Sequence, residues 1–198
     1  MDIVLILFII ALICIICVLY FKMLHTDMTY VKSNLDDQYY LVRNEPDKQE
    51  AANTLAKIRE NILLLSNYLY QNMNNPEFVD FKEYIIRLYE RAPTIIIIES
   101  TKDSQYTSYS INKGEQIVFC LRKKVLPNNL HDINLMMYVV LHEISHVACP
   151  IYDNHGPLFR KIFNFITLNA IKLNIYSKIE FEKTPVNYCG LLITDSIV

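Results

Sequence analysis

The chain of 198 residues has no tryptophan, only 3 glycines and 7 prolines, and no long basic run. So little glycine and proline excludes collagen-like and linker-rich chains, and a hydrophobic fraction of 52% excludes an intrinsically disordered one. The 19 Lys and Arg nearly balance 21 Asp and Glu, so the sequence predicts no basic surface for a nucleic-acid duplex. We therefore expect one domain of ordinary size with an appendage, and no nucleic-acid partner.

Cysteine is also scarce, with 5 in the chain. Cys14 and Cys17 lie inside an apolar segment, whereas Cys120, Cys149 and Cys189 are widely spaced. An odd and scattered set of three is not a disulfide framework, and no C-x-x-C pair outside the apolar segment indicates a zinc knuckle. The cysteine pattern therefore predicts free thiols, in agreement with a reducing compartment.

The apolar segment, Ile3 to Phe21, contains no charge over 19 residues. As a helix it is about 28 Å long, close to the hydrocarbon thickness of a bilayer. A buried core helix is the alternative, but this segment is apolar on all sides. We expect a transmembrane anchor at residues 1–22 and one domain at 23–198. Lys22 and Lys32 follow the anchor and no Lys or Arg precedes it, which favours a single-pass protein with a cytosolic domain.

The remaining segments predict a small sheet with hairpins, packed on helices, in an α+β fold. Helices are indicated by apolar residues at spacings of three and four, and strands by short β-branched or aromatic runs next to turn residues. The expected elements are a hairpin at 29–44, helices at 47–72 and from 78 to before Pro93, a strand at 94–99, a hairpin at 108–121, and helices at 132–148 and 157–174.

The expected helix at 132–148 ends in the sequence HEISH. Its histidines, His142 and His146, are four residues apart and so project from one helical face, where both imidazoles can bind one metal ion. Glu143 lies next to the first histidine and can act as a general base on a water at the open coordination position. The pattern therefore predicts a zinc site with a catalytic glutamate.

A third ligand is expected at His155, nine residues after His146. Asn154 and Gly156 favour a sharp turn, and Pro157 can begin the next helix, which brings His155 back over the first pair. Cys149 is close enough in sequence to reach the metal but is expected to be a small packing residue, and Asp153 remains a weaker alternative as a carboxylate third ligand. The other two histidines, His25 and His131, are expected at the surface.

A zinc peptidase also needs a hydrogen-bond donor where negative charge develops on the carbonyl oxygen. Tyrosine supplies such a donor, and the chain has 14 tyrosines. The sequence leaves four of them open for this role: Tyr109, Tyr152, Tyr176 and Tyr188.

The segment HEISHVACPIYDNHGPLF resembles the zinc-binding region of the SprT-like and WLM metallopeptidases. The HGPxF form resembles SprT, and the short spacing to the third histidine resembles WLM. The segments YLVRNEPDKQEAANTLAKIRENILLL, SYSINKGEQIVFCLR and PVNYCG are similar to WLM-type proteins of giant DNA viruses and some protists. The resemblance covers nearly all of residues 29–195 and implies a zincin-like fold, one Zn²⁺ on His142, His146 and His155, and Glu143 as the catalytic residue.

These observations together predict a membrane-anchored zinc metallopeptidase that hydrolyses peptide bonds in a protein or peptide substrate. Residues 3–21 are expected in a host or virion membrane, and the strand Gln116 to Leu121 is expected as the sheet edge that binds an extended peptide. One alternative is a non-catalytic, membrane-anchored structural or interaction protein with a zinc-stabilised fold. The other is a protease for DNA–protein crosslinks, as in soluble SprT and WLM enzymes.

Overall fold

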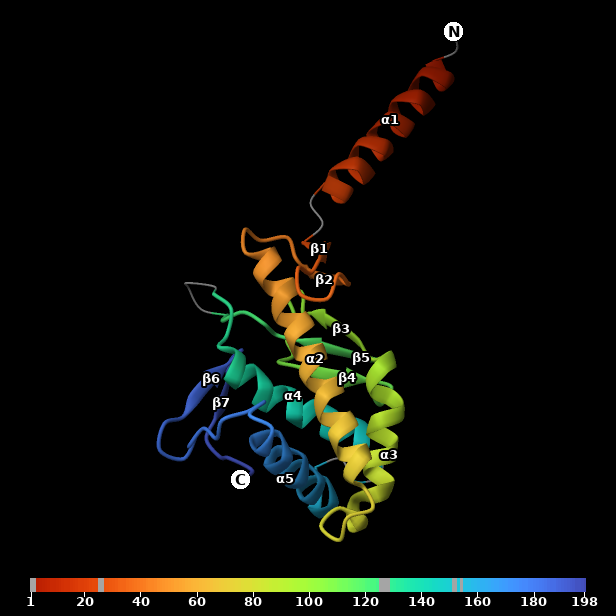
Figure 1. Ribbon diagram of the computed structural model, residues 1–198. Helices are drawn as coiled ribbons and strands as arrows, with labels where there is room; N and C mark the ends of the chain where they lie inside the picture. The colour runs from red at the N-terminus through yellow and green to blue at the C-terminus, as the bar shows by residue number, and fades with distance from the viewer. Residues whose placement is uncertain (1–2, 25–26, 125–128, 151–152, 154) are drawn as a thin grey trace.

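The elements follow one another in the order that the sequence patterns predict. The computed structural model describes the chain except for residues 1–2, 25–26, 125–128, 151–152 and 154 (Figure 1). Within the described residues the fold is α+β, as expected. The predicted surface position of His25 lies outside the described residues.

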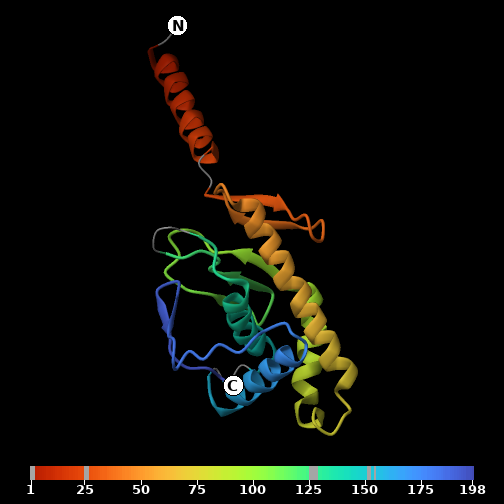
Figure 2. The same cartoon turned by 60° about the vertical axis from the view of Figure 1, so that its left-hand side comes forward.

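The apolar segment forms helix α1 (Ile3–Leu24), and both views show it projecting away from the rest of the chain (Figures 1 and 2). However, among the described residues no helix has an apolar stretch long enough to cross a membrane. The predicted transmembrane anchor and the single-pass membrane localisation are therefore wrong.

A hairpin and a long helix begin the rest of the fold. Strands β1 (Met28–Lys32) and β2 (Tyr39–Arg43) pair antiparallel, with Met28 opposite Arg43, which confirms the first predicted hairpin. Helix α2 (Lys48–Asn72) buries its apolar stripe, including Leu55, Ile58 and Leu65, as the spacing predicted. The helix α3 (Lys82–Arg91) packs beside it, between the short 3₁₀ turns η1 (Val79–Phe81) and η2 (Ala92–Thr94).

The main sheet has three strands: β3 (Ile96–Glu99), β4 (Tyr109–Ile111) and β5 (Gln116–Phe119). Their order is β3-β5-β4, with β3 parallel and β4 antiparallel to β5. The predicted edge strand, Gln116 to Leu121, is thus the central strand, because the hairpin places β4 on one side and β3 occupies the other. Strands β3 and β4 are the two edge strands of this sheet.

Helix α4 (Ile133–Ala148) is the most deeply buried helix of the described chain, and α5 (Pro157–Lys172) packs against it. Figures 1 and 2 show α4 between α2 on one side and a C-terminal hairpin on the other. That hairpin consists of β6 (Val186–Tyr188) and β7 (Leu191–Ile193), paired antiparallel. The sequence patterns did not predict it, because each strand has only three residues.

A disulfide joins Cys120, directly after β5, to Cys189 in the β6–β7 turn. The prediction of free thiols is therefore wrong for this pair, because the fold brings together two cysteines that are 69 residues apart in sequence. His131 lies against the same junction, with its ring 4.9 Å from that of Tyr188 and only 6% of its surface exposed. His131 is thus a buried residue and not the expected surface residue.

Candidate metal centre

Helix α4 presents the HEISH motif on a rigid, buried element. Its first turn is capped by the Asp132 carboxylate, which accepts hydrogen bonds from the backbone N–H groups of Asn134 and Leu135. The helix continues without a break to Ala148, so His142 and His146 lie one turn apart. Because the two histidines are four residues apart, both imidazoles lie on the same face of the helix, as predicted from the spacing.

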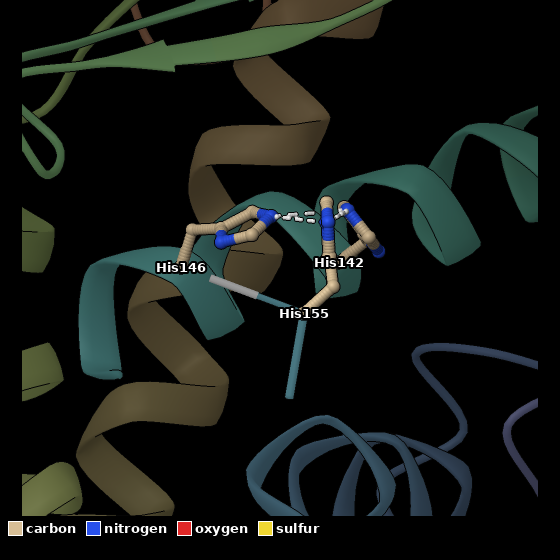
Figure 3. A group of neighbouring side chains, drawn as sticks. All are labelled: His142, His146 and His155. Carbon is tan, nitrogen blue, oxygen red and sulfur yellow. Dashed lines mark hydrogen bonds between the residues drawn. The ribbon is translucent and has the colours of Figure 1, made fainter. Parts of the chain in front are cut away.

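The third imidazole, that of His155, meets the other two at one point (Figure 3). The Nε2 atoms of His142 and His146 are 3.2 Å apart, and the Nε2 of His155 lies 3.0 Å from His146 and 3.2 Å from His142. Three nitrogens at the corners of a tetrahedral zinc site, each about 2.05 Å from the ion, are separated by roughly 3.3 Å. The three imidazoles therefore fit a single zinc ion without rearrangement.

The start of helix α5 places His155. Gly156 is the N-cap residue and Pro157 occupies the first turn, as the sequence predicted. The Asp153 carboxylate accepts a hydrogen bond from the Phe159 N–H at 3.0 Å, and a Cβ on Gly156 would collide with that carboxylate. A side chain at position 156 would therefore displace the Asp153 carboxylate, which caps α5 outside the histidine cluster.

Cys149 also lies outside the cluster. Its thiol is hydrogen-bonded to the Asp153 backbone carbonyl at 3.3 Å, and the residue is 1% exposed.

The turn between β4 and β5 closes over the same end of α4, where the Lys113 ammonium donates to the carbonyls of His146 and Cys149. Gly114 in this turn has a φ of +95°, and a Cβ there would lie 2.8 Å from a Val147 methyl group. The main sheet and helix α4 are therefore in direct contact at this turn.

Aromatic rings from α5 support the three imidazoles. The Phe159 ring stacks on His146 with centroids 4.3 Å apart, and it meets the edges of His142 and His155 at 5.1 and 5.0 Å. Phe163 contacts His142 from the same helix at 5.3 Å. These contacts restrict the ring orientations, so little conformational entropy remains to be lost on metal binding.

The imidazoles of the motif are held in the form that binds a metal. Burial, and then the neighbouring imidazoles, lowers the pKa of His142 to about 3 and that of His146 to about 4. Both rings are consequently neutral near pH 7 and have a lone pair available.

Burial also raises the pKa of Glu143 to about 7, and this side chain is only 5% exposed. A carboxyl group with such a pKa can both accept and release a proton near neutral pH.

The histidines and Glu143 open onto a cleft of about 830 Å³. One wall is α4, a second is β4 with the residues before it, and a third is the C-terminal hairpin. The third wall contributes a mostly apolar surface of Leu191, Leu192 and Ile193. The cleft therefore has the volume and the partly apolar lining that are typical of a ligand-binding site, next to the three imidazoles.

Comparison with known proteins assigns the chain to a family. "Uncharacterized protein R325" of Acanthamoeba polyphaga mimivirus is 42% identical over 189 residues, and the match covers 94% of each chain. The chain belongs to the R325 family. "Uncharacterized protein 136R" of Invertebrate iridescent virus 6 is 38% identical over 83 residues, which is 41% of this chain and 44% of that protein. Both relatives are viral, as the resemblance implied.

Two further comparisons concern family models and solved structures. No protein-family model matches the chain. The crystal structure of Wss1 from Saccharomyces cerevisiae is similar over 68% of this chain and 87% of the Wss1 chain, with a TM-score of 0.47 and 16% sequence identity.

The sequence of this R325-family member leaves four tyrosines as candidate hydrogen-bond donors, and the structure separates them. Tyr109 and Tyr188 line the cleft. Tyr176 does not line it, and its hydroxyl accepts a hydrogen bond from the Ile179 N–H. Tyr152 lies outside the described residues. Tyr138 also lines the cleft and was not predicted, although its position on the face of α4 that carries His142 was visible in the helical spacing.

Proposed function

We propose that the protein is a zinc-dependent metallopeptidase. The observation that carries this proposal is the convergence of the His142, His146 and His155 Nε2 atoms, all within 3.2 Å of one another, beside the buried Glu143 in an open cleft. The motif and its third histidine also resemble the zinc-binding region of WLM and SprT-like metallopeptidases. Three nitrogen ligands with a neighbouring glutamate are the donor set of a catalytic zinc site.

His142, His146 and His155 would hold the ion, which when bound supplies Lewis acidity that polarises a carbonyl and acidifies a water. Glu143 accepts a proton from the attacking water as the water oxygen bonds to the peptide carbonyl carbon. It then transfers this proton to the nitrogen as the C–N bond breaks, leaving a carboxyl group and an amine. Both transfers are favoured by the pKa of Glu143 of about 7.

The substrate of this proposal is an extended segment of a protein or peptide, bound along β4. Strand β4 pairs with β5 on one side only and lines the cleft with Tyr109 and Ser110. An extended peptide adds to such an edge through backbone hydrogen bonds. Leu191 and Leu192 of the opposite wall, each more than half exposed at 54% and 55%, offer apolar contacts to its side chains.

A zinc-stabilised scaffold without catalysis is the competing interpretation, and it requires a fourth protein ligand. Cys149 is the nearest candidate in sequence for that ligand, but its thiol is engaged with the Asp153 carbonyl. Within the described residues, the metal-binding cluster contains three groups and all are histidines. The geometry thus favours a catalytic site over a structural one.

Replacing Glu143 with glutamine tests the function. We expect the purified wild type to contain one zinc per chain and to cleave casein, and E143Q to keep its zinc while losing at least about 10²-fold in activity, because no carboxylate remains to move the proton. H142A, H146A and H155A, assayed in parallel for zinc by atomic absorption, should lose the metal. Equal cleavage by wild type and E143Q, or a full zinc content in all three alanine variants, would contradict the proposal.

A further inference from the structure

The hydroxyl groups of Ser108 and Tyr188 form a close pair in the wall of the cleft. Ser108 precedes β4 and Tyr188 ends β6, and their oxygens are 2.6 Å apart. Both residues line the cleft together with His142 and Glu143. The pair therefore faces the same space as the three imidazoles, although its members are 80 residues apart in sequence.

The pair has one hydrogen-bond donor more than it uses. Two hydroxyl groups carry two protons, and one of these lies between the two oxygens. The Cys120 N–H donates to the Ser108 Oγ at 3.2 Å and so occupies an acceptor position without consuming a hydroxyl proton. Among the described residues no acceptor lies within hydrogen-bond distance of the second proton. A buried donor without a partner is costly unless a ligand supplies the acceptor.

The pair is also held rigidly. Tyr188 is 1% exposed, its ring contacts that of His131, and the next residue, Cys189, is covalently joined to Cys120. Burial, with a smaller contribution from the Glu143 carboxylate, raises the pKa of Tyr188, so the hydroxyl keeps its proton at neutral pH. A donor fixed in place before the reaction stabilises developing charge better than one that must reorient.

The other tyrosines of the cleft lack this arrangement. The Tyr138 hydroxyl already donates to the Asp195 carbonyl at 3.2 Å. Tyr109 is only half-buried, and among the described residues its hydroxyl has no hydrogen-bond partner to orient it. Tyr188 is thus the tyrosine of the cleft with both an oriented hydroxyl and a spare proton in its pair.

We propose that the Ser108–Tyr188 pair donates the hydrogen bond that stabilises the carbonyl oxygen of the scissile peptide. This inference rests on the proposed peptidase function. As the water oxygen bonds to the carbonyl carbon, the π electrons of the C=O bond move onto the oxygen, which becomes negative. The spare proton remains on the pair and hydrogen-bonds this oxygen. The C=O bond then re-forms as the amine leaves with the proton from Glu143.

Replacing Tyr188 with phenylalanine removes the hydroxyl and keeps the ring. We expect Y188F to lose roughly 10²–10³-fold in kcat on a fluorogenic peptide, the loss typical of one oxyanion donor, with KM and zinc content unchanged. Affinity for a phosphinic peptide, whose tetrahedral oxyanion resembles the intermediate, should fall by a similar factor in calorimetry. Y30F, which removes the hydroxyl of an exposed tyrosine on β1 outside the cleft, is the control and should retain the wild-type kcat and affinity.

S108A provides a second variant. It leaves the Tyr188 hydroxyl without its orienting partner, so we expect an intermediate loss of about 10-fold in kcat with zinc retained. If Y188F loses its zinc or its fold, S108A and the phosphinic-peptide affinity decide the question. Wild-type kcat and affinity in both variants, or an equal loss in Y30F, overturns the assignment. If E143Q is inactive while Y188F keeps the wild-type kcat, only the role of the Ser108–Tyr188 pair is rejected. If E143Q is fully active, the proposed peptidase function and the role of the pair are both rejected.

Discussion

The positions of His142, His146 and His155 were predictable from the local sequence, whereas the position of His131 was not. His142 and His146 follow from local geometry, because a helix repeats at 3.6 residues and four positions bring side chains onto one face. His155 follows from Gly156 and Pro157, whose backbone preferences determine the turn and the start of α5. His131 has no such local signal, since its burial depends on Tyr188 and Cys189, which come much later in the chain.

His131 should make the protein sensitive to mild acid. Burial lowers its pKa from 6.5 to about 4, so the folded state disfavours the charged ring. Below pH 6.5 the unfolded chain binds a proton that the folded chain does not, and the free energy of unfolding therefore falls as the pH drops from 6.5 towards 4. The loss is at most about 3 kcal/mol.

Urea denaturation of wild type and H131Q at several pH values, both in the presence of a chelator, measures this loss. H131Q should be less stable than wild type at pH 7.5, and the difference between the two should narrow towards pH 4.5, because glutamine does not titrate. A difference that stays constant over this range would show that the pKa of His131 is the same in the folded and the unfolded protein.

At the level of secondary structure, the sequence predicted the helices but not the order of the strands in the main sheet. Apolar residues at spacings of three and four predicted α2, α4 and α5 to within a few residues, because each helix buries one stripe. The central position of β5 depends on its pairing with β3, a non-local contact with no signature in either strand. The sheet edge beside the cleft, β4, could therefore be identified only from the fold.

The C-terminal hairpin depends on a single covalent link. The disulfide between Cys120 and Cys189 closes a loop of 69 residues, and the chain-entropy estimate for such a loop is about 4 kcal/mol. Reduction with dithiothreitol should therefore lower the free energy of unfolding and release β6 and β7 from β5. We expect KM to rise, because Leu191 and Leu192 then no longer form the third wall of the cleft.

Hydrogen–deuterium exchange at residues 186–193 reports the release directly, and zinc content should not change. C149A, which removes a cysteine outside the disulfide, is the control and should respond to dithiothreitol as wild type does. A C120S/C189S variant should reproduce the reduced state without reductant. Unchanged exchange and KM in both the reduced protein and this variant would show that the hairpin does not need the link.

The whole molecule is held together by a buried charge network that spans its sequence. Glu99 lies between two arginines, with its Oε1 3.2 Å from the Arg122 Nε and 3.6 Å from the Arg43 Nε. Arg122 also pairs with Asp47, the N-cap residue of α2, at 2.8 Å. The network thus joins the first hairpin, α2 and the sheet, and no sequence pattern predicted it because its members come from four separate segments.

Replacing Glu99 with alanine should destabilise the protein by about 3–5 kcal/mol, because the Arg122 guanidinium would remain buried with one partner fewer. E60A is the control, since Glu60 forms an exposed pair with Lys57, and it should cost less than about 1 kcal/mol. Chemical denaturation measures both. Equal losses in the two variants would mean that the buried network contributes no more than a surface ion pair.

The order of the cleft walls along the chain has a consequence for biosynthesis. A ribosome makes His142, His146 and His155 well before the hairpin of residues 186–193 that completes the cleft. The three candidate metal ligands are therefore present in a growing chain while one wall is still missing, and the disulfide that secures this wall can form only after Cys189 has emerged. The complete cleft would thus form late in translation, after most of the fold is already made.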